Sequence, residues 1–384
     1  MESPTTSPAP LALYVHWPFC KSKCPYCDFN SHVRDSVDAG AWQRALLSEL
    51  EVMAAWMPDH QLSSIFFGGG TPSLMPPAIA DSLINRAAQH WDVSPTLEIT
   101  LEANPTSVEM HKLRDFKAAG INRVSLGVQS LRPEALAFLG REHSASEALH
   151  AVELAASLFD RFSFDLIYAR PDQTCAAWEA ELREALTYAG DHLSLYQLTI
   201  EPNTAFHHAY FNQQAFALPR DETAAQMYQL TLDVMADAGL PAYEISNHAR
   251  AGQASRHNLS YWRGESYIGI GPGAHGRVWR NGAWHATHTR KSPERWLERT
   301  LADGHGLEED SVLTASERAE EYVMMGLRLR EGIRLDWQGL DAVLDIAARD
   351  RLIAQGFLRL EPHRLLATSK GWLLLNSVIA ELLS

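Results

Sequence analysis

The chain has 384 residues and a formal net charge of −14, from 33 Lys and Arg against 47 Asp and Glu. This length can bury a large core and predicts one large domain with a smaller one. The negative charge argues against nucleic acid or an anionic membrane surface as the main partner.

The ends of the chain lack the patterns of targeting and membrane segments. Residues 1–10 have no basic start and no apolar core, which predicts a disordered tail and not a signal peptide. The longest apolar stretch, residues 372–383, is too short and too interrupted to span a bilayer. Four cysteines, three of them clustered, are typical of a reducing cytoplasm, so we expect a cytoplasmic protein. Cys175 stands apart from the others and is expected to be an ordinary thiol.

Strand-like apolar runs alternate with helical patterns over the first 200 residues. The predicted strands are residues 11–15, 64–67, 97–101, 123–128, 162–168 and 193–200. The predicted helices lie between them at residues 42–57, 77–90, 107–119, 145–159 and 176–189. Six successive βα units imply a parallel sheet with right-handed crossovers. Eight units would close a barrel, so six predict an incomplete (β/α)6 barrel of class α/β, with functional residues at the carboxyl ends of the strands.

Three cysteines follow the first predicted strand with the spacing C-x3-C-x2-C: Cys20, Cys24 and Cys27. Soft sulfur ligands suit zinc or an iron–sulfur cluster. A structural zinc site needs four ligands, so this alternative requires His16 or His32 as the fourth. A [4Fe–4S] cluster on three thiolates leaves one iron open for chemistry, and the spacing favours this interpretation over zinc or over three unrelated thiols.

Two glycine-rich stretches also deserve a functional interpretation. Gly68-Gly-Gly70-Thr71-Pro72 runs straight out of the second predicted strand, so a ligand could touch its backbone directly. Beside a cysteine loop this favours a ligand site over a flexible turn. Residues 269–276 (GIGPGAHG) are expected to form a close-packed loop near the barrel mouth, because no strand-to-helix context supports a dinucleotide site.

These motifs together resemble a known family. The cysteine loop followed by GGGTP resembles the radical S-adenosylmethionine (SAM) enzymes. The segments YVHWPFCKSKCPYCDFNSH, FFGGGTPS, EANP, GVQS, GREH, YQLTIEPNT and HNLSYW resemble the HemN/HemW group over nearly the whole chain. That group contains oxygen-independent coproporphyrinogen III dehydrogenases and HemW-type haem chaperones. In the family, SAM chelates the open iron and the reduced cluster splits its sulfonium to a 5′-deoxyadenosyl radical.

The resemblance assigns roles to individual residues. It implies that Cys20, Cys24 and Cys27 hold the cluster. It implies that SAM is contacted by Tyr14, Tyr26, Gly69, Gly70, Thr71, Glu102, Gln129, Arg141 and Asp165. The residue pattern agrees for Glu102 and Gln129, which end predicted strands, and for Asp165, since a carboxylate inside a buried strand is costly unless paired or bound. Where the family reads G-L-P after this aspartate, the chain has Ala169-Arg170-Pro171, which could alter the turn.

Two features favour the chaperone branch. The dehydrogenases carry another cysteine two residues after the third cluster cysteine and a longer N-terminal segment, whereas this chain has Phe29 there and thirteen residues before Tyr14. HemW-type proteins carry H-N-x-x-Y-W, which His257, Asn258, Tyr261 and Trp262 match. Imidazole is a good axial ligand for haem iron and aromatic rings offer flat apolar faces, so we expect these four residues to contact haem. The resemblance therefore implies haem delivery to client proteins, with oxygen-independent coproporphyrinogen III dehydrogenation as the alternative; whether the chain is an enzyme stays open.

The sequence pattern and the resemblance also predict the domains and the partners. We expect a tail at residues 1–10, the barrel and its extension with the HNxxYW motif at 11–305, and a mainly helical, winged-helix-like domain at 306–384. Its predicted helices are residues 315–330, 337–344 and 346–355, followed by a hairpin and a last helix. Residues 311–384 contain nine Lys and Arg against ten Asp and Glu, so this segment lacks the excess of positive charge that nucleic acid binding requires. The expected partners are haem and haem-accepting clients, with membrane contact only through clients and a homodimer as an alternative to a monomer.

Overall fold

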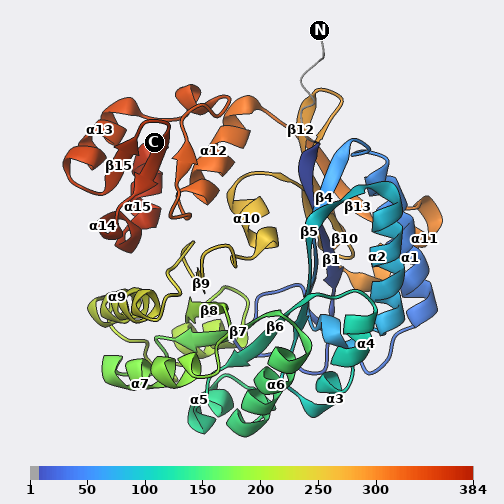
Figure 1. Ribbon diagram of the computed structural model, residues 1–384, viewed down its shortest axis with the longest axis horizontal. Coiled ribbons are helices and arrows are strands. Elements are labelled where there is room, and N and C mark those ends of the chain that lie inside the picture. Colours follow the sequence, from blue (N-terminus) through green and yellow to red (C-terminus); the bar gives the residue numbers. More distant parts are fainter. Residues whose placement is uncertain (1–7, 384) are drawn as a thin grey trace.

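The computed structural model describes residues 8–383, without the side chains of residues 107 and 108, as an open barrel with a smaller domain at its side (Figure 1). Within these residues the central sheet has eleven strands in the order β13-β12-β11-β10-β1-β4-β5-β6-β7-β8-β9. Six strands run parallel in chain order: β1 (Ala9–Trp17), β4 (His60–Gly69), β5 (Asp92–Ala103), β6 (Arg123–Gln129), β7 (Arg161–Tyr168) and β8 (His192–Gln197). This order confirms the predicted incomplete (β/α)6 barrel.

The first strand begins earlier than the sequence pattern indicated. Ala9 and Pro10 already belong to β1, so the predicted tail at residues 1–10 extends two residues too far toward the C-terminus. Residues 1–7 of that prediction lie outside the described residues. The pairing of β1 with β4 continues to Trp17 and Gly69, which places the ends of both strands side by side.

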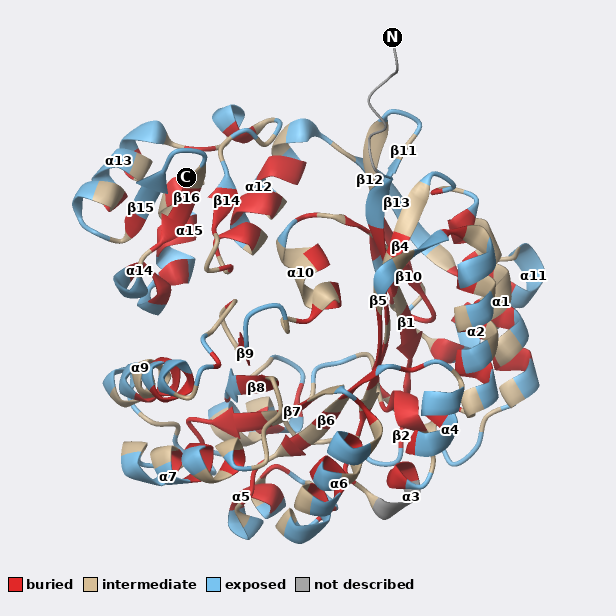
Figure 2. Ribbon diagram, in the orientation of Figure 1, coloured by how far each residue is buried: buried red, intermediate tan, exposed pale blue. Residues whose placement is uncertain are grey.

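The helices that connect the parallel strands cover the outer face of the sheet, with their buried sides toward it (Figure 2). They are α1 (Ala39–Ala54), α2 (Pro77–His90), α3 (Ser107–Met110), α4 (Leu113–Ala118), α5 (Pro133–Phe138), α6 (Ala145–Leu158) and α7 (Cys175–Leu186). The predicted single helix at residues 107–119 is wrong, because the chain breaks into α3 and α4. Within α3 the buried carboxylate of Glu109 accepts hydrogen bonds from the Asn104 backbone N–H and the Ser73 hydroxyl.

Both edges of the barrel carry strands that the sequence analysis did not predict. On one side β10 (Ser266–Ile270) runs parallel to β1, and β11 (His275–Arg280), β12 (Ala283–Thr289) and β13 (Leu307–Leu313) continue the sheet antiparallel. On the other side β9 (Asn247–Ala249) pairs antiparallel with β8. The helices of this region are α8 (Ala205–His207), α9 (Asp221–Asp237), α10 (Arg256–Trp262) and α11 (Pro293–Asp303), and a π-helical turn, His208–Asn212, follows α8.

A buried carboxylate holds this extension to the barrel. Glu49 of α1 accepts hydrogen bonds from the backbone N–H groups of Gly271 and Gly306, both at 2.7 Å, and from the indole of Trp296 at 3.0 Å. Burial raises the pKa of Glu49 to about 7, although these three donors oppose the shift. A β-carbon on Gly271 would lie 2.3 Å from the carbonyl oxygen of His16. The glycine-rich loop is therefore close-packed beside the end of β1, as its composition predicted.

The C-terminal part has a hydrophobic core of its own, built around residues such as Leu327, Leu352 and Trp372. Its elements are α12 (Ala315–Gly326), β14 (Ile333–Arg334), α13 (Ile346–Ala354), β15 (Leu358–Glu361), β16 (Arg364–Ala367), α14 (Ser369–Leu373) and α15 (Leu375–Leu382). The predicted helix at 337–344 is wrong: it is reduced to a 3-10 turn, Leu340–Ala342, after Gly339 in the left-handed region at φ +83°. The Trp337 ring instead stacks on Tyr322 at 3.8 Å. The domain limits given above stay predictions.

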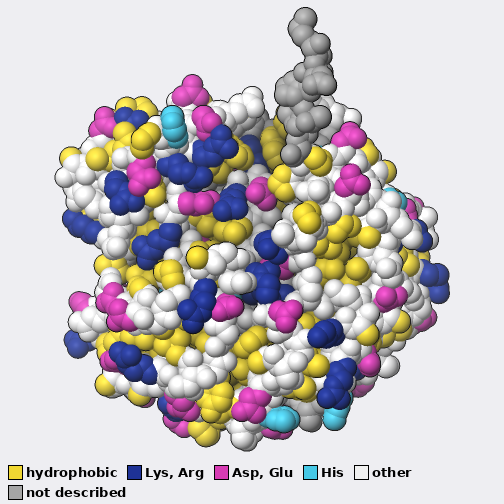
Figure 3. Space-filling view, viewed as in Figure 1, with side chains coloured by type: hydrophobic (Ala, Val, Ile, Leu, Met, Phe, Trp, Pro, Cys, Tyr) yellow, Lys and Arg dark blue, Asp and Glu magenta, His cyan; other side chains and the backbone are white. Residues whose placement is uncertain are grey.

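Charges of both signs lie on the described surface. Figure 3 shows Lys and Arg interspersed with Asp and Glu on the face that it presents, including the C-terminal part at upper left. Of the helices in residues 8–383, none is long and apolar enough to cross a membrane.

Candidate functional site

A cavity of about 530 Å³ lies at the carboxyl ends of the parallel strands, where a barrel fold is expected to bind its ligand. Its wall combines the loops after β1 and β4 with inward-facing residues of β5, β6, β7 and β8. The residues predicted for the cluster and SAM that line it are Cys20, Cys24, Cys27, Tyr26, Gly69, Gly70, Thr71, Glu102, Gln129, Arg141 and Asp165. Residues from separate segments of the chain thus face one space.

The three clustered cysteines lie on the loop after β1, which begins with the short strand β2 (Phe19–Cys20) and returns through β3 (His32–Val33). The Thr71 hydroxyl donates a hydrogen bond to the Cys20 sulfur at 3.4 Å, and the Arg141 guanidinium donates to the Cys24 sulfur at 3.3 Å. Burial raises the pKa of the thiols of Cys20 and Cys27. Bound iron would supply the positive charge that makes thiolates of them at neutral pH.

The zinc alternative would need His16 or His32 as a ligand, and both imidazoles are already engaged. His16 Nε2 pairs with the carbonyl oxygen of Asn30 at 2.9 Å and its Nδ1 with the Tyr14 hydroxyl at 3.0 Å, while His32 Nε2 pairs with Asn30 Oδ1 at 3.1 Å. Within residues 8–383 no three His, Cys, Asp or Glu side chains are grouped for a single metal ion. His16 could complete a zinc site only if one of its two hydrogen bonds broke, whereas a cluster on three thiolates needs no histidine.

The glycine loop, residues 68–72, needs its glycines for close contacts within the protein as well as for access by a ligand. A β-carbon on Gly69 would lie 2.6 Å from the His16 ring, and one on Gly70 would lie 2.8 Å from the backbone of Pro18. The N–H of Gly70 donates to the Trp17 carbonyl at 2.8 Å and that of Gly69 donates to Glu102 at 3.2 Å. Because these donors are used within the protein, the loop can offer a ligand backbone carbonyls. Such acceptors suit an amino group.

Two inward-facing carboxylates lie on the cavity floor. Burial raises the pKa of Glu102 to about 8, with the nearby Asp165 adding to the shift, and burial raises the pKa of Asp165 to about 6. Both groups are therefore poised to ionise when a cationic or hydroxyl-rich ligand binds between them.

Two other residues of the cavity each have one buried polar atom without a hydrogen-bond partner among residues 8–383. Gln129 lies in the left-handed region at φ 69°, which costs a non-glycine residue about 1–2 kcal/mol, and its Oε1 is buried without a partner. Arg141 donates to Asn104 Oδ1 and the Gly127 carbonyl, yet its Nε is also buried without a partner. Strain and unsatisfied polar atoms gathered at one cavity indicate a binding site for a polar ligand.

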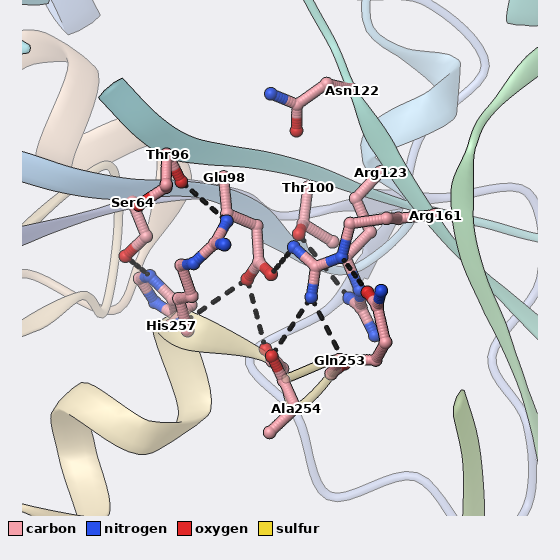
Figure 4. A network of polar contacts seen from close by, with 12 residues as sticks. Ser64, Thr96, Glu98, Thr100, Asn122, Arg123, Arg161, Gln253, Ala254 and His257 are labelled. Atoms are coloured by element: carbon pink, nitrogen blue, oxygen red, sulfur yellow. Dashed lines mark hydrogen bonds and ion pairs between the residues drawn. The ribbon is translucent and has the colours of Figure 1, made fainter. Parts of the chain in front are cut away.

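A second polar layer lies deeper in the barrel and was not predicted. Arg161 donates to Glu98 at 2.6 Å, and the Glu98 carboxylate also accepts from the Ser255 hydroxyl at 3.3 Å and the His257 backbone N–H at 3.2 Å (Figure 4). Burial by itself raises the pKa of Glu98, but Arg123 and Arg161 hold it below its ordinary value. A sequence signal did exist, because polar residues occur at alternate positions of three strands, as expected for strands with a polar inner face. They are residues 98, 100 and 102 of β5, residues 123 and 125 of β6, and residues 161, 163 and 165 of β7.

The HNxxYW motif forms α10, which packs against β4 inside the open side of the barrel. His257 is buried, with 1% of its surface exposed. Its Nδ1 pairs with the Ser64 hydroxyl at 2.9 Å, its Nε2 pairs with the Tyr261 hydroxyl at 2.8 Å, and its ring stacks on Phe66 at 4.9 Å. Neither ring nitrogen is available to iron in this arrangement. Haem contact by His257, Asn258, Tyr261 and Trp262 stays a prediction, and ligation by His257 requires both hydrogen bonds to break.

Four further residues lie apart from the cavity. Tyr14 is not among its lining residues, since its hydroxyl binds His16 and its ring stacks on Phe66. Ala169 adopts φ 56°, a left-handed conformation that glycine would favour, so the turn that the family makes with glycine is kept. Arg170 turns away and forms a buried ion pair with Glu181. Cys175 lies at the start of α7, where its sulfur contacts Gln226.

Two family descriptions match separate parts of the chain. Residues 14–185 match the radical SAM superfamily, and residues 313–374 match the HemN C-terminal domain. The first range contains the cysteine loop, the glycine loop and Asp165, and the second covers most of the C-terminal elements.

Curated proteins match the chain along nearly its whole length. It is 39% identical to mouse radical S-adenosyl methionine domain-containing protein 1, mitochondrial, over 99% of this chain and 89% of that protein. It is 37% identical to the protein named heme chaperone HemW of Escherichia coli, over 96% of this chain and 97% of that protein. Among solved structures, coproporphyrinogen III oxidase (HemN) of Escherichia coli superposes with a TM-score of 0.79 over 98% of this chain and 91% of that one, at 22% identity. At that identity the likeness shows a shared fold.

Proposed function

The chain belongs to the HemN/HemW group of the radical SAM superfamily, and we propose that it binds haem and delivers it to haem-requiring proteins. The observation that carries this proposal is 37% identity, over 96% of the chain, to a protein named heme chaperone HemW. Relatives from Haemophilus influenzae and Mycobacterium tuberculosis with the same name are 36% and 35% identical. The cytoplasmic location and the homodimer stay predictions, and curated relatives from three vertebrates are named mitochondrial.

Membership of the superfamily implies a [4Fe–4S] cluster and SAM, and the cavity residues fit both. We propose that Cys20, Cys24 and Cys27 hold the cluster, whose open iron would bind SAM and supply the electron that cleaves it. Thr71 and Arg141 donate hydrogen bonds to two of these sulfurs and so orient them.

The remaining cavity residues would surround SAM. The glycine loop offers carbonyls to its amino group, while Glu102 and Asp165 offer carboxylates to its cationic and hydroxyl groups. Gln129 and Arg141 have buried polar atoms in need of a partner, which a polar cofactor would provide. Tyr26 completes the wall with a ring that packs toward Phe206 at 6.3 Å.

The alternative function is oxygen-independent dehydrogenation of coproporphyrinogen III, because the same fold is found in HemN. One position argues against it. The residue two positions after Cys27 is Phe29, with 59% of its surface exposed at the cavity, where the dehydrogenases carry a cysteine. A phenyl ring provides no thiolate for binding or proton transfer, so this part of the dehydrogenase site is missing.

Anaerobic reconstitution of the full chain with iron and sulfide, followed by titration with haem, tests the proposal. We expect stoichiometric binding with a Soret shift, followed by transfer of the haem to the apo form of a b-type haem protein. Absence of haem binding by the cluster-loaded protein would overturn the chaperone assignment. Conversion of coproporphyrinogen III with SAM and a reductant would establish the alternative.

A further inference from the structure

The segment that leaves β8 forms an aromatic rim beside the cavity. Thr199 and Glu201 still line the cavity, and the chain then enters α8 and the π-helical turn. The N–H of Phe206 donates to the carbonyl of Pro25 at 2.8 Å, which ties this segment to the cysteine loop. π-Helical turns are rare and are frequently found at functional sites. We name residues 205–216 the aromatic rim.

The aromatic rim rests on apolar residues and presents an aromatic ring to solvent. Phe206 is buried and packs against Phe138 at 4.7 Å and Phe216 at 5.2 Å. Phe211 is 59% exposed, the same fraction as Phe29 on the cysteine loop. Exposing a large ring costs free energy in water. Phe29 lines the cavity and Phe211 belongs to the segment that is tied to the same loop, so the two exposed rings favour a flat apolar ligand between cavity and rim.

Two imidazoles of the rim keep a ring nitrogen that could bind a metal, and one of them packs against Phe211. His207 lies one helical turn from Phe211, with the two ring centroids 4.7 Å apart, and the imidazole makes no hydrogen bond within the part of the chain that the structure describes. Its neighbour His208 pairs through Nδ1 with the side chain of Asn212 at 2.9 Å and keeps Nε2 open, so the ring contact with Phe211 is what singles out His207. His257, by contrast, has both ring nitrogens engaged in the barrel interior.

Charges near the mouth suit the edge of a porphyrin. Lys21 and Lys23 line the cavity on the cysteine loop, both exposed and without an ion pair among residues 8–383. Asp28 and Glu201 line the same cavity, so its wall carries both signs of charge. Haem carries two propionates, which exposed ammonium groups can pair with.

Resting on the proposed function, we propose that haem binds on the aromatic rim, with His207 as its axial ligand, Phe211 and Phe29 against the porphyrin and its propionates toward Lys21 and Lys23. A single imidazole on an exposed helix, in contrast to a deep two-ligand site, suits a protein that must release its cargo. The site also lies next to the cluster loop without sharing the residues assigned to SAM.

The test compares haem titrations of the full, cluster-loaded chain and its variants. His207→Ala should shift the Soret band and weaken binding by more than about tenfold, which is about 1.4 kcal/mol. Added imidazole should restore the band to the wild-type position. Phe211→Ala should weaken binding without moving the band, and His208→Ala is the matched control expected to bind as the wild type does. The iron–sulfur absorption of each variant checks that the cluster is intact.

The outcomes separate this inference from the function on which it rests. A His207→Ala protein with the wild-type spectrum and affinity overturns the assignment of the ligand, and so does loss of binding in His208→Ala. In both cases the wild-type protein still binds haem, so the proposed function stands. If the wild-type protein binds no haem, it is the proposed function that fails.

Discussion

Replacing His257 by Gln tests whether this histidine is a neutral, buried part of the barrel interior. Burial lowers the pKa of His257 from its ordinary value of 6.5 to about 3, and Arg123 adds to the shift against the opposing effect of Glu98. The folded protein therefore holds this ring neutral where the unfolded chain protonates it. Its contribution to stability is complete above pH 6.5 and is lost as the pH falls from 6.5 toward 3.

The size of the effect follows from the contacts. At pH 8 the glutamine variant loses the stack on Phe66 and one of the two hydrogen bonds to Ser64 and Tyr261, which costs about 1–3 kcal/mol. At pH 5, about 1.5 pH units below 6.5, protonation of the unfolded chain removes about 2 kcal/mol from the wild-type protein and nothing from the variant at this position. The stability difference between the two proteins should shrink by about 2 kcal/mol.

Urea unfolding of the apoproteins at pH 8 and pH 5, followed by tryptophan fluorescence, measures this difference. Other buried histidines, including His16, His143 and His248, are present in both proteins, so their contributions cancel. His150→Gln, at an exposed position of α6, is the matched control. A stability gap that is the same at both pH values would refute the reasoning, and so would a variant as stable as the wild type at pH 8.

Three further outcomes are expected. After anaerobic reconstitution, Cys24→Ala should lose the visible iron–sulfur absorption and Cys175→Ala should keep it; stoichiometric zinc in natively isolated protein would contradict the cluster. The wild-type protein should not consume coproporphyrinogen III with SAM and a reductant, because Phe29 replaces the dehydrogenase cysteine; formation of protoporphyrinogen would show otherwise. SAM should bind the cluster-loaded protein more tightly as the pH rises from 6 to 8, because burial holds the Glu102 carboxyl protonated up to about pH 8 and only its anion attracts a sulfonium. Glu102→Gln should flatten this dependence in calorimetric titrations, and an unchanged slope would exclude Glu102 as the titrating group.

Local patterns were enough to predict the parallel half of the fold. Each of the six strands is a short apolar run and each connecting helix repeats apolar residues at helical spacing, so neighbours in sequence carry the signal. The same holds for the cysteine loop and the glycine loop, since both follow directly from strands that lie side by side. The helix expected at residues 337–344 failed because Gly339 favours a left-handed turn and the Trp337 ring finds a partner in Tyr322.

The role of the polar residues could not be found in the same way. The H-N-x-x-Y-W motif is the same sequence whether the histidine ring faces solvent, haem or the barrel interior, so the motif cannot tell these cases apart. Its position follows from Ser64 and Glu98, which lie 193 and 159 residues away in the chain. The free imidazole of His207 had no motif at all to distinguish it among seventeen histidines.

Sequence patterns were enough to predict the class of the barrel, the cysteine motif and the family. These depend on residue types at short fixed spacings, which survive in the linear chain. Tertiary packing was needed to show that β10 to β13 extend the sheet, that Tyr14 lies outside the cavity and that His257 is enclosed while His207 is half-buried. Those facts depend on which distant segments come to bury each side chain, and burial is a property of the folded chain that no local spacing of residues fixes.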